Sequence, residues 1–140
     1  MINTSIYCLT LNSEHEEIIK KLSYIPVGLG NKTFSKNCLT DKEGENISHK
    51  NDYYGEYTFH YWIWKNYLRE IKTEWVGFCQ YRKFFVEKEF IQENIKFEQL
   101  KKSIISEIDN SNANYCLLYT SDAADDSLRV DLGGRRIIKK

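Results

Sequence analysis

The chain has 140 residues, with 20 basic and 20 acidic side chains and therefore a formal net charge of zero. This balance argues against a nucleic-acid-binding protein, because that class normally carries a basic excess. The sequence has no apolar run of the roughly 20 residues that a membrane span needs. Its first residues lack the basic and apolar regions of a signal peptide. Together these features predict a cytoplasmic protein.

Strand-like and helical patterns alternate in the first part of the chain. Residues 5–11 (SIYCLTL) predict a first strand. Residues 13–22 predict a helix that is capped by Ser13 and carries an apolar stripe of Ile18, Ile19 and Leu22. Residues 24–30 (YIPVGLG) predict a brief extended piece, and residues 31–52 form a polar loop of a length that is usually functional or disordered.

The segment 51–68 is the most distinctive part of the sequence. Asn51 or Asp52 can cap a helix there. Aromatic and apolar residues recur at helical spacing on one face of this helix: Tyr53, Tyr57, Tyr61, Trp64 and Leu68. Phe59, Trp62 and Ile63 make its middle apolar nearly all round, which predicts a buried helix that serves as core rather than as a platform for sugars.

Residues 75–79 (WVGFC) predict a central strand, and the basic, aromatic sequence QYRKFF follows it as a turn. Residues 97–108 predict an amphipathic helix with Leu100, Ile104, Ile105 and Ile108 inward. The order of these elements predicts an α/β sheet with helices on its faces.

Residues 116–140 (CLLYTSDAADDSLRVDLGGRRIIKK) resemble translated sequencing-adapter DNA. Back-translation of CLLYTSDAADD is similar to the transposon end of an adapter, and that of VDLGGRRII is similar to its outer primer in the same reading frame; a natural polar tail is the alternative. On the adapter interpretation, residues 1–115 are the N-terminal part of a truncated domain, and residues 116–140 are no domain. The acids Asp122, Asp125 and Asp126 and the patch 133–136 then carry no function.

Three short segments offer candidate chemistry. Tyr81, Arg82 and Lys83 follow the strand predicted at 75–79, at an edge where α/β sheets collect ligands. Arg and Lys would grip a phosphate there; an ordinary surface turn is the alternative. Residues 44–48, with Lys50 nearby, could arrange backbone amides around an anion or form a plain turn.

Glu56 lies four residues before His60 and could act as a general base or as a ligand for a metal or hydroxyl group. A structural hydrogen bond to His60 or to the neighbouring loop is the alternative. The cysteines Cys8, Cys38, Cys79 and Cys116 are widely spaced, and His15 and His49 show no ligand spacing. Free thiols are therefore expected rather than disulfides or a zinc site.

Two strings resemble a known family. DKEGENISHKNDYYGEYTFHYWIWKN (41–66) and VGFCQYRKFF (76–85) resemble the bacterial family catalogued as domain of unknown function 4422, over a span of about residues 6–85. That family is similar to glycosyltransferases of the A-type fold and is associated with capsular and exopolysaccharide synthesis. The sequence departs from the family at Glu45 (usually Asp), Gly55 (commonly Cys) and Gln80 (usually His), and Leu11 and Asn12 stand near an expected His-Lys pair.

The resemblance implies an incomplete, A-type-like (Rossmann-like) α/β fold that transfers a sugar from a nucleotide-sugar donor, a uridine diphosphate sugar, to a growing surface polysaccharide. The acceptor would be a glycan or a lipid-linked glycan, and any membrane contact would be peripheral, at the inner face of the cell membrane. Mg²⁺ or Mn²⁺, or basic side chains, would neutralise the diphosphate; the resemblance identifies no metal ligands. This fragment alone is expected to be inactive.

The resemblance also implies roles for individual residues. Arg82 and Lys83 would contact the diphosphate and Tyr81 would stack or hydrogen-bond. The site would be lined by Asp41, Asn46, Ser48, Lys50 and Asn51, and Glu56 would be the catalytic or acceptor-binding acid. The competing interpretation is a non-catalytic carbohydrate-binding module that uses the aromatic helix and the basic turn.

Overall fold

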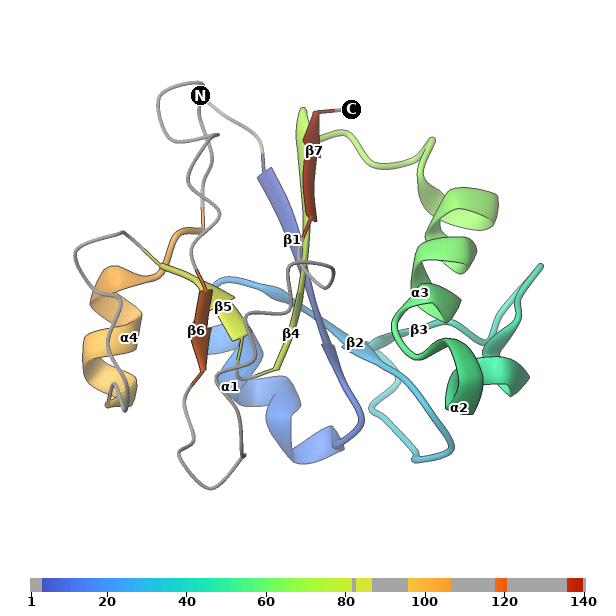
Figure 1. Cartoon of the computed structure of the whole chain (residues 1–140), viewed down its shortest axis with the longest axis horizontal. Coiled ribbons are helices and arrows are strands. Elements are labelled where there is room, and N and C mark those ends of the chain that lie inside the picture. Colours follow the sequence, from blue (N-terminus) through green and yellow to red (C-terminus); the bar gives the residue numbers. More distant parts are fainter. Residues whose placement is uncertain (1–3, 82, 87–95, 107–117, 121–135, 140) are drawn as a thin grey trace.

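The computed structural model describes residues 4–81, 83–86, 96–106, 118–120 and 136–139, the last two ranges by backbone alone. A 7-stranded sheet forms its centre (Figure 1). Strands β1 (Thr4–Thr10), β2 (Ile25–Gly28), β3 (Leu39–Thr40) and β4 (Trp75–Gln80) are parallel and lie in the order β3-β2-β1-β4. The predicted α/β class and the central strand at 75–79 are therefore confirmed.

Antiparallel strands complete the other side of β4. The sequence QYRKFF, predicted as a turn, continues into β5 (Lys83–Phe85), whose first residue pairs with Gln80. Strand β6 (Leu118–Thr120) pairs with β5, and β7 (Arg136–Lys139) pairs with β4. These last two strands lie in the segment predicted to be translated adapter; the origin of that segment stays a prediction.

The two faces of β1 explain why its sequence is apolar throughout rather than alternating. Ile6 and Cys8 pack on one face with Ile19 of helix α1 (Glu16–Lys21). Tyr7 and Leu9 point to the other face and pack with Phe59. A strand buried on both sides needs apolar residues at every position, and helices cover both sides of this one (Figure 1).

The first helical segment begins one residue earlier than predicted. The side chain of Asn12, rather than Ser13, accepts a hydrogen bond from the Glu14 backbone N–H at 3.1 Å and caps the short 3-10 helix η1 (Ser13–His15). Asn and Ser are comparable N-caps, so the local sequence alone did not decide between the two residues.

The helix predicted over 51–68 is broken. A 3-10 helix η2 (Ser48–Lys50) leads into α2 (Asn51–Tyr54), Gly55 interrupts the chain with φ +53° and ψ −128°, and α3 (Tyr57–Trp62) continues into a π-helix η3 (Ile63–Tyr67). Asn51 Nδ2 donates to Gly55 O and to Thr58 Oγ1, both at 3.0 Å, and holds the break in place.

The segment 51–68 is buried on one side only, rather than nearly all round as predicted. Thr58, Phe59, Trp62 and Ile63 face the core, whereas Tyr53 is 88% exposed and Trp64 is 60% exposed. Tyr57, Tyr61 and Trp64 share the other side of the helix at ordinary helical spacing. Because both sides carry aromatic residues, the period of 3.6 residues does not show which of them is buried.

The last described helix, α4 (Phe97–Ser103), is shorter than predicted. At Ile104 the backbone becomes extended, and the Ile105 N–H donates to Phe85 O at 2.8 Å. The chain therefore returns to the sheet where a longer helix was expected, and Ile108 lies outside the described residues. In the described part of the chain, no helix has the length and apolar character to cross a membrane.

Candidate functional site

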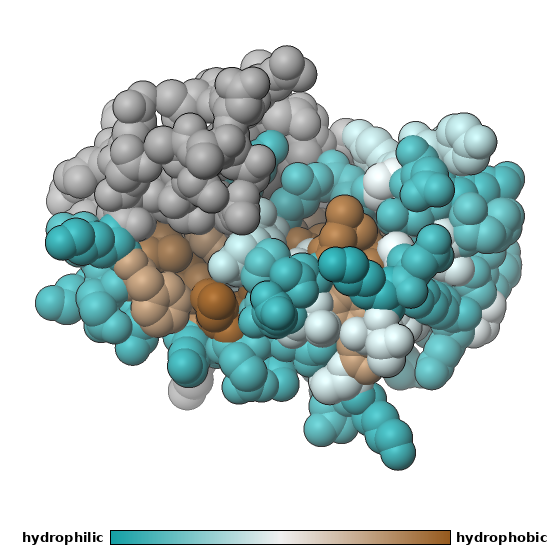
Figure 2. Space-filling view, turned by 90° about the horizontal axis from the view of Figure 1, so that it is seen from below, coloured by the Kyte–Doolittle hydropathy of each residue, from teal (hydrophilic) through white to brown (hydrophobic). Residues whose placement is uncertain are grey.

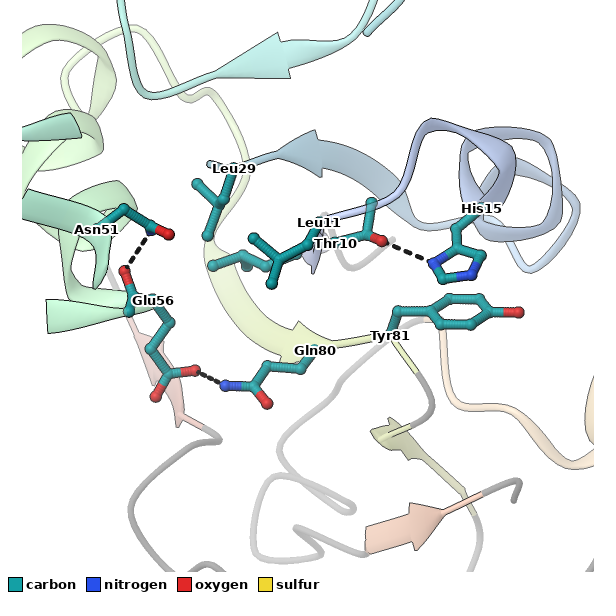
Figure 3. A pocket seen from close by; sticks show the side chains of 10 residues that line it. Thr10, Leu11, His15, Leu29, Asn51, Glu56, Gln80 and Tyr81 are labelled. Carbon is teal, nitrogen blue, oxygen red and sulfur yellow. Dashed lines mark hydrogen bonds between the residues drawn. The ribbon is translucent and has the colours of Figure 1, made fainter. Parts of the chain in front are cut away.

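A pocket of about 290 Å³ lies at the carboxyl ends of β1 and β4. From β1 the chain passes through α1 to β2, which pairs with one edge of β1, whereas the later strand β4 pairs with the other edge. The strand order therefore reverses at β1, and in open α/β sheets ligands bind at such a reversal. Ten residues line the pocket: Leu9, Thr10, Leu11, His15, Leu29, Asn51, Gly55, Glu56, Gln80 and Tyr81 (Figure 3). Viewed from this end, the surface is mostly hydrophilic, with hydrophobic residues showing in two places (Figure 2).

One side of the pocket is formed by a hydrogen bond between β4 and the start of α3. Gln80 Nε2 donates to Glu56 Oε2 at 2.6 Å, and both side chains line the pocket (Figure 3). The amide is neutral at any pH, so the bond orients the Glu56 carboxylate without placing a second charge beside it. A carboxylate held in this way can accept a proton or a hydroxyl hydrogen bond from a ligand.

The opposite side of the pocket is formed by two stacked rings. The rings of His15 and Tyr81 lie 3.6 Å apart between centroids with an interplanar angle of 12° (Figure 3). Thr10 Oγ1 lies 2.7 Å from His15 Nδ1 and fixes the imidazole, while the Tyr81 N–H donates to Leu9 O at 2.8 Å. The predicted stacking partner Tyr81 is thus stacked on a histidine that the sequence analysis had left without a role.

The predicted site residues divide between the pocket and its surroundings. Asn51, Glu56 and Tyr81 line the pocket. Lys83 begins β5 and is half-buried, outside the lining. Arg82 lies outside the described residues, between a residue that lines the pocket and the first residue of β5.

The loop at 41–50 is folded on itself rather than open to a ligand. Asn46 Nδ2 donates to Lys42 O and Gly44 O, while Asn46 Oδ1 accepts from the Ser48 backbone and hydroxyl. The Glu45 N–H donates to Asn66 Oδ1 at 3.1 Å, so two amides proposed for anion binding already have partners. The plain-turn interpretation fits better, and Asn46, Ser48 and the exposed Lys50 stand apart from the pocket lining.

Gly44 is required where this loop meets η3. Its φ is +68°, and a Cβ added to it would lie 2.4 Å from Asn66 Oδ1. Asn66 Nδ2 in turn donates to Glu45 O at 2.8 Å and Trp62 O at 3.0 Å. The Gly-Glu-Asn sequence that suggested an anion site is therefore a docking turn, closed by one asparagine of the π-helix.

Asp41 directly follows β3, at the same edge of the sheet, and is fully buried. Among the described residues neither of its carboxylate oxygens has a hydrogen-bond partner. Buried carboxylates normally find partners because their desolvation is costly. Asp41 does not line the pocket, so this geometry does not place its side chain where the predicted binding role would need it.

Seven residues that line the pocket were not predicted as site residues: Leu9, Thr10, Leu11, His15, Leu29, Gly55 and Gln80. Leu11 and His15 follow β1, just as Tyr81 follows β4. The sequence signal for Thr10, Leu11, His15 and Gln80 is their place at the carboxyl ends of two strands, because neighbouring parallel strands end at one edge.

The described residues contain no group of three or more His, Cys, Asp or Glu side chains that could hold a metal ion. Glu56 is the acidic side chain among the pocket's described lining residues. Mg²⁺ can bind through one or two carboxylates together with substrate phosphates, so metal dependence stays a prediction.

Comparisons with known proteins agree with this geometry. The structure titled "WbbM bifunctional glycosytransferase apo structure" is 30% identical, with a TM-score of 0.50, over 71% of this chain and 19% of that chain. The chain thus spans about a fifth of that protein's length. No curated protein matches the chain. Residues 7–121 match the family described as Domain of unknown function (DUF4422), and the chain belongs to that family.

Proposed function

We propose that this chain carries the donor-binding half of a glycosyltransferase, which transfers a sugar from a nucleotide-sugar to a growing bacterial surface polysaccharide. The observation that carries the proposal is the pocket at the reversal of strand order, between the ends of β1 and β4. The 30% identity to a chain titled as a glycosyltransferase supports it. The sugar donor would be a uridine diphosphate sugar.

The stacked rings of His15 and Tyr81 and the apolar side chains of Leu11 and Leu29 suit the base and ribose of the donor. Aromatic faces bind planar rings well. The diphosphate would extend toward Arg82 and Lys83, which follow Tyr81 in the chain and supply positive charge. Mg²⁺ or Mn²⁺ would supply further neutralisation when bound.

Glu56 would act on the acceptor. In the transfer step an acceptor hydroxyl oxygen bonds to the anomeric carbon, and the bond from that carbon to the diphosphate breaks with its electron pair on the leaving group. Glu56 takes the proton that the hydroxyl loses, while Gln80 holds the carboxylate in place. The catalytic assignment rests on this hydrogen bond and on the position of Glu56 in the pocket lining.

The donor site is tested by uridine diphosphate binding to a matched pair of variants. Leu11 lines the pocket and is 60% exposed, so its substitution should leave the fold intact. Leu11→Glu places a negative charge in the pocket that receives the negatively charged nucleotide and should weaken binding about tenfold relative to Leu11→Gln, which has the same size and no charge. Isothermal titration would measure both affinities. Equal affinities, or no binding to the parent chain, would contradict the proposal.

A non-catalytic carbohydrate-binding module is the second candidate. The exposed aromatic side chains of Tyr53, Tyr57 and Trp64 favour it. Glycan binding by the parent chain together with no uridine diphosphate binding would support the module over the enzyme.

A further inference from the structure

An exposed stripe of aromatic side chains runs from α2 along α3 into the π-helix. We define it as the aromatic stripe, formed by Tyr53, Tyr54, Tyr57, Tyr61 and Trp64. Tyr53 is 88%, Tyr54 52%, Tyr57 45% and Trp64 60% exposed, and the rings of Tyr61 and Trp64 meet edge-on at 5.9 Å. Isolated exposed aromatics are common, but four exposed aromatic side chains beside the half-buried Tyr61 on one segment indicate a binding surface.

The stripe is continuous with the pocket along the chain. Asn51, Gly55 and Glu56 line the pocket, and Tyr53, Tyr54 and Tyr57 are interleaved with them in sequence. Figure 1 places α2 beside the carboxyl ends of the parallel strands and α3 leading away from them. A molecule that enters the pocket and extends outward along these helices would therefore pass over the stripe.

The chemistry of the stripe selects an uncharged, hydroxylated partner. Tyr61 OH donates to Glu45 Oε1 at 2.6 Å, and Lys65 Nζ lies 3.4 Å from the same oxygen and 4.3 Å from the Trp64 ring centroid. The charges of Glu45 and Lys65 cancel locally, whereas attraction to an anionic membrane surface requires a basic excess. The Lys65 ammonium lies over the Trp64 ring, and the exposed tyrosines of the stripe combine ring faces for stacking with hydroxyl groups for hydrogen bonds, which suits sugar rings.

We propose that the aromatic stripe binds the neutral glycan acceptor several sugars away from its reacting end. This inference rests on the proposed glycosyltransferase function, because the acceptor's reacting hydroxyl would lie at Glu56. The stripe fixes the direction in which the glycan leaves the pocket: across Tyr53, Tyr54 and Tyr57 at the rim, then toward Trp64. Remote binding of this kind contributes affinity and positions the reacting group without taking part in the chemical step.

The experiment measures glycan binding by the full chain with maltohexaose, cellohexaose and a linear galactan hexaose as probes. The double variant Tyr57→Ala/Trp64→Ala should bind the preferred hexaose at least tenfold more weakly than the parent. The matched control is Phe97→Ala: Phe97 is an exposed aromatic on α4 with Lys101 Nζ 5.9 Å from its ring centroid, so it shares the aromatic–lysine arrangement of Trp64 outside the stripe. The control should retain the parent affinity.

Uridine diphosphate affinity, measured on the same samples, separates the two proposals. The double variant should keep it, because neither residue lines the pocket. Nucleotide binding without binding of any hexaose would overturn the stripe and leave the donor site standing. Equal hexaose affinity in the double variant and the parent would also overturn the proposal for the stripe. A third result would do the same: the parent binds phosphatidylglycerol vesicles but no hexaose, and the double variant no longer binds the vesicles. Melting temperatures of all variants check that the fold is kept.

Discussion

The break at Gly55 is the local feature on which the pocket depends most directly. At φ +53° and ψ −128° its backbone is accessible to glycine and strained for any L side chain. A Cβ added there would meet nothing within 4 Å. The cost of Gly55→Ala is therefore backbone strain alone, about 1–3 kcal/mol, offset by about 0.4–1 kcal/mol from the smaller entropy of the unfolded chain.

The net expectation is a loss of about 1–2 kcal/mol in the free energy of unfolding, or a melting temperature lower by several degrees. Alanine also favours a continuous helix through the break, which would distort the part of the pocket lining formed by Asn51, Gly55 and Glu56 and weaken uridine diphosphate binding. Urea unfolding followed by circular dichroism measures the first effect, and titration with nucleotide the second. Asp52→Ala, one turn earlier on α2, is the control for alanine itself. Unchanged stability and unchanged binding in Gly55→Ala would refute the reasoning.

Four further substitutions test other contacts. Tyr24→Phe removes the hydroxyl that donates to Ile105 O at 2.6 Å and should cost about 1–3 kcal/mol in urea unfolding because a buried carbonyl loses its partner; no loss would contradict this role. Burial alone would raise the pKa of Glu16, but hydrogen bonds from Ser35 outweigh it and lower that pKa below the ordinary 4.5. The Ser35 contacts thus stabilise the fold above about pH 4.5, and this stabilisation is lost as pH falls through the lowered pKa. Glu16→Gln should therefore be less stable than the parent at pH 7, and the difference in stability should shrink in acid. A difference that stays constant with pH would contradict this role of the Glu16 carboxylate. Asp41→Asn removes a buried charge without a hydrogen-bond partner among the described residues and should raise the melting temperature; a fall of several degrees would show that the carboxylate is needed. Glu56→Gln should keep uridine diphosphate affinity and, in the full-length enzyme, lower the transfer rate at least a hundredfold; normal transfer would remove Glu56 from catalysis.

The strands β1, β2 and β4 were predictable because they read as short apolar, strand-like runs, as in WVGFC. The strands β3 and β5 were not, because they are short and lie in segments that read as a polar loop and a turn. The buried side of the segment 51–68 was not predictable, because aromatic residues stand on both sides of α3 and their spacing alone does not choose between them. Glu56, Asn51 and Tyr81 could be singled out from local sequence and from the family resemblance. Their arrangement with His15 and Gln80 depends on where β1 and β4 end relative to each other, which pairing between distant segments decides.

The parallel pairing of β1 with β4 also governs how the chain acquires its structure. Thr4 pairs with Trp75 and Leu9 with Gln80, whereas the other edge of β1 pairs with the nearby residues 25–28. During synthesis, the β1–α1–β2 unit can therefore form early, while one edge of β1 waits for a partner encoded much later. Closing so long an intervening loop is slow, and an unpaired edge in the interval invites association with other chains. The strand that supplies one half of the pocket is thus the last to complete the parallel part of the sheet, and ligand binding can report that this part has formed.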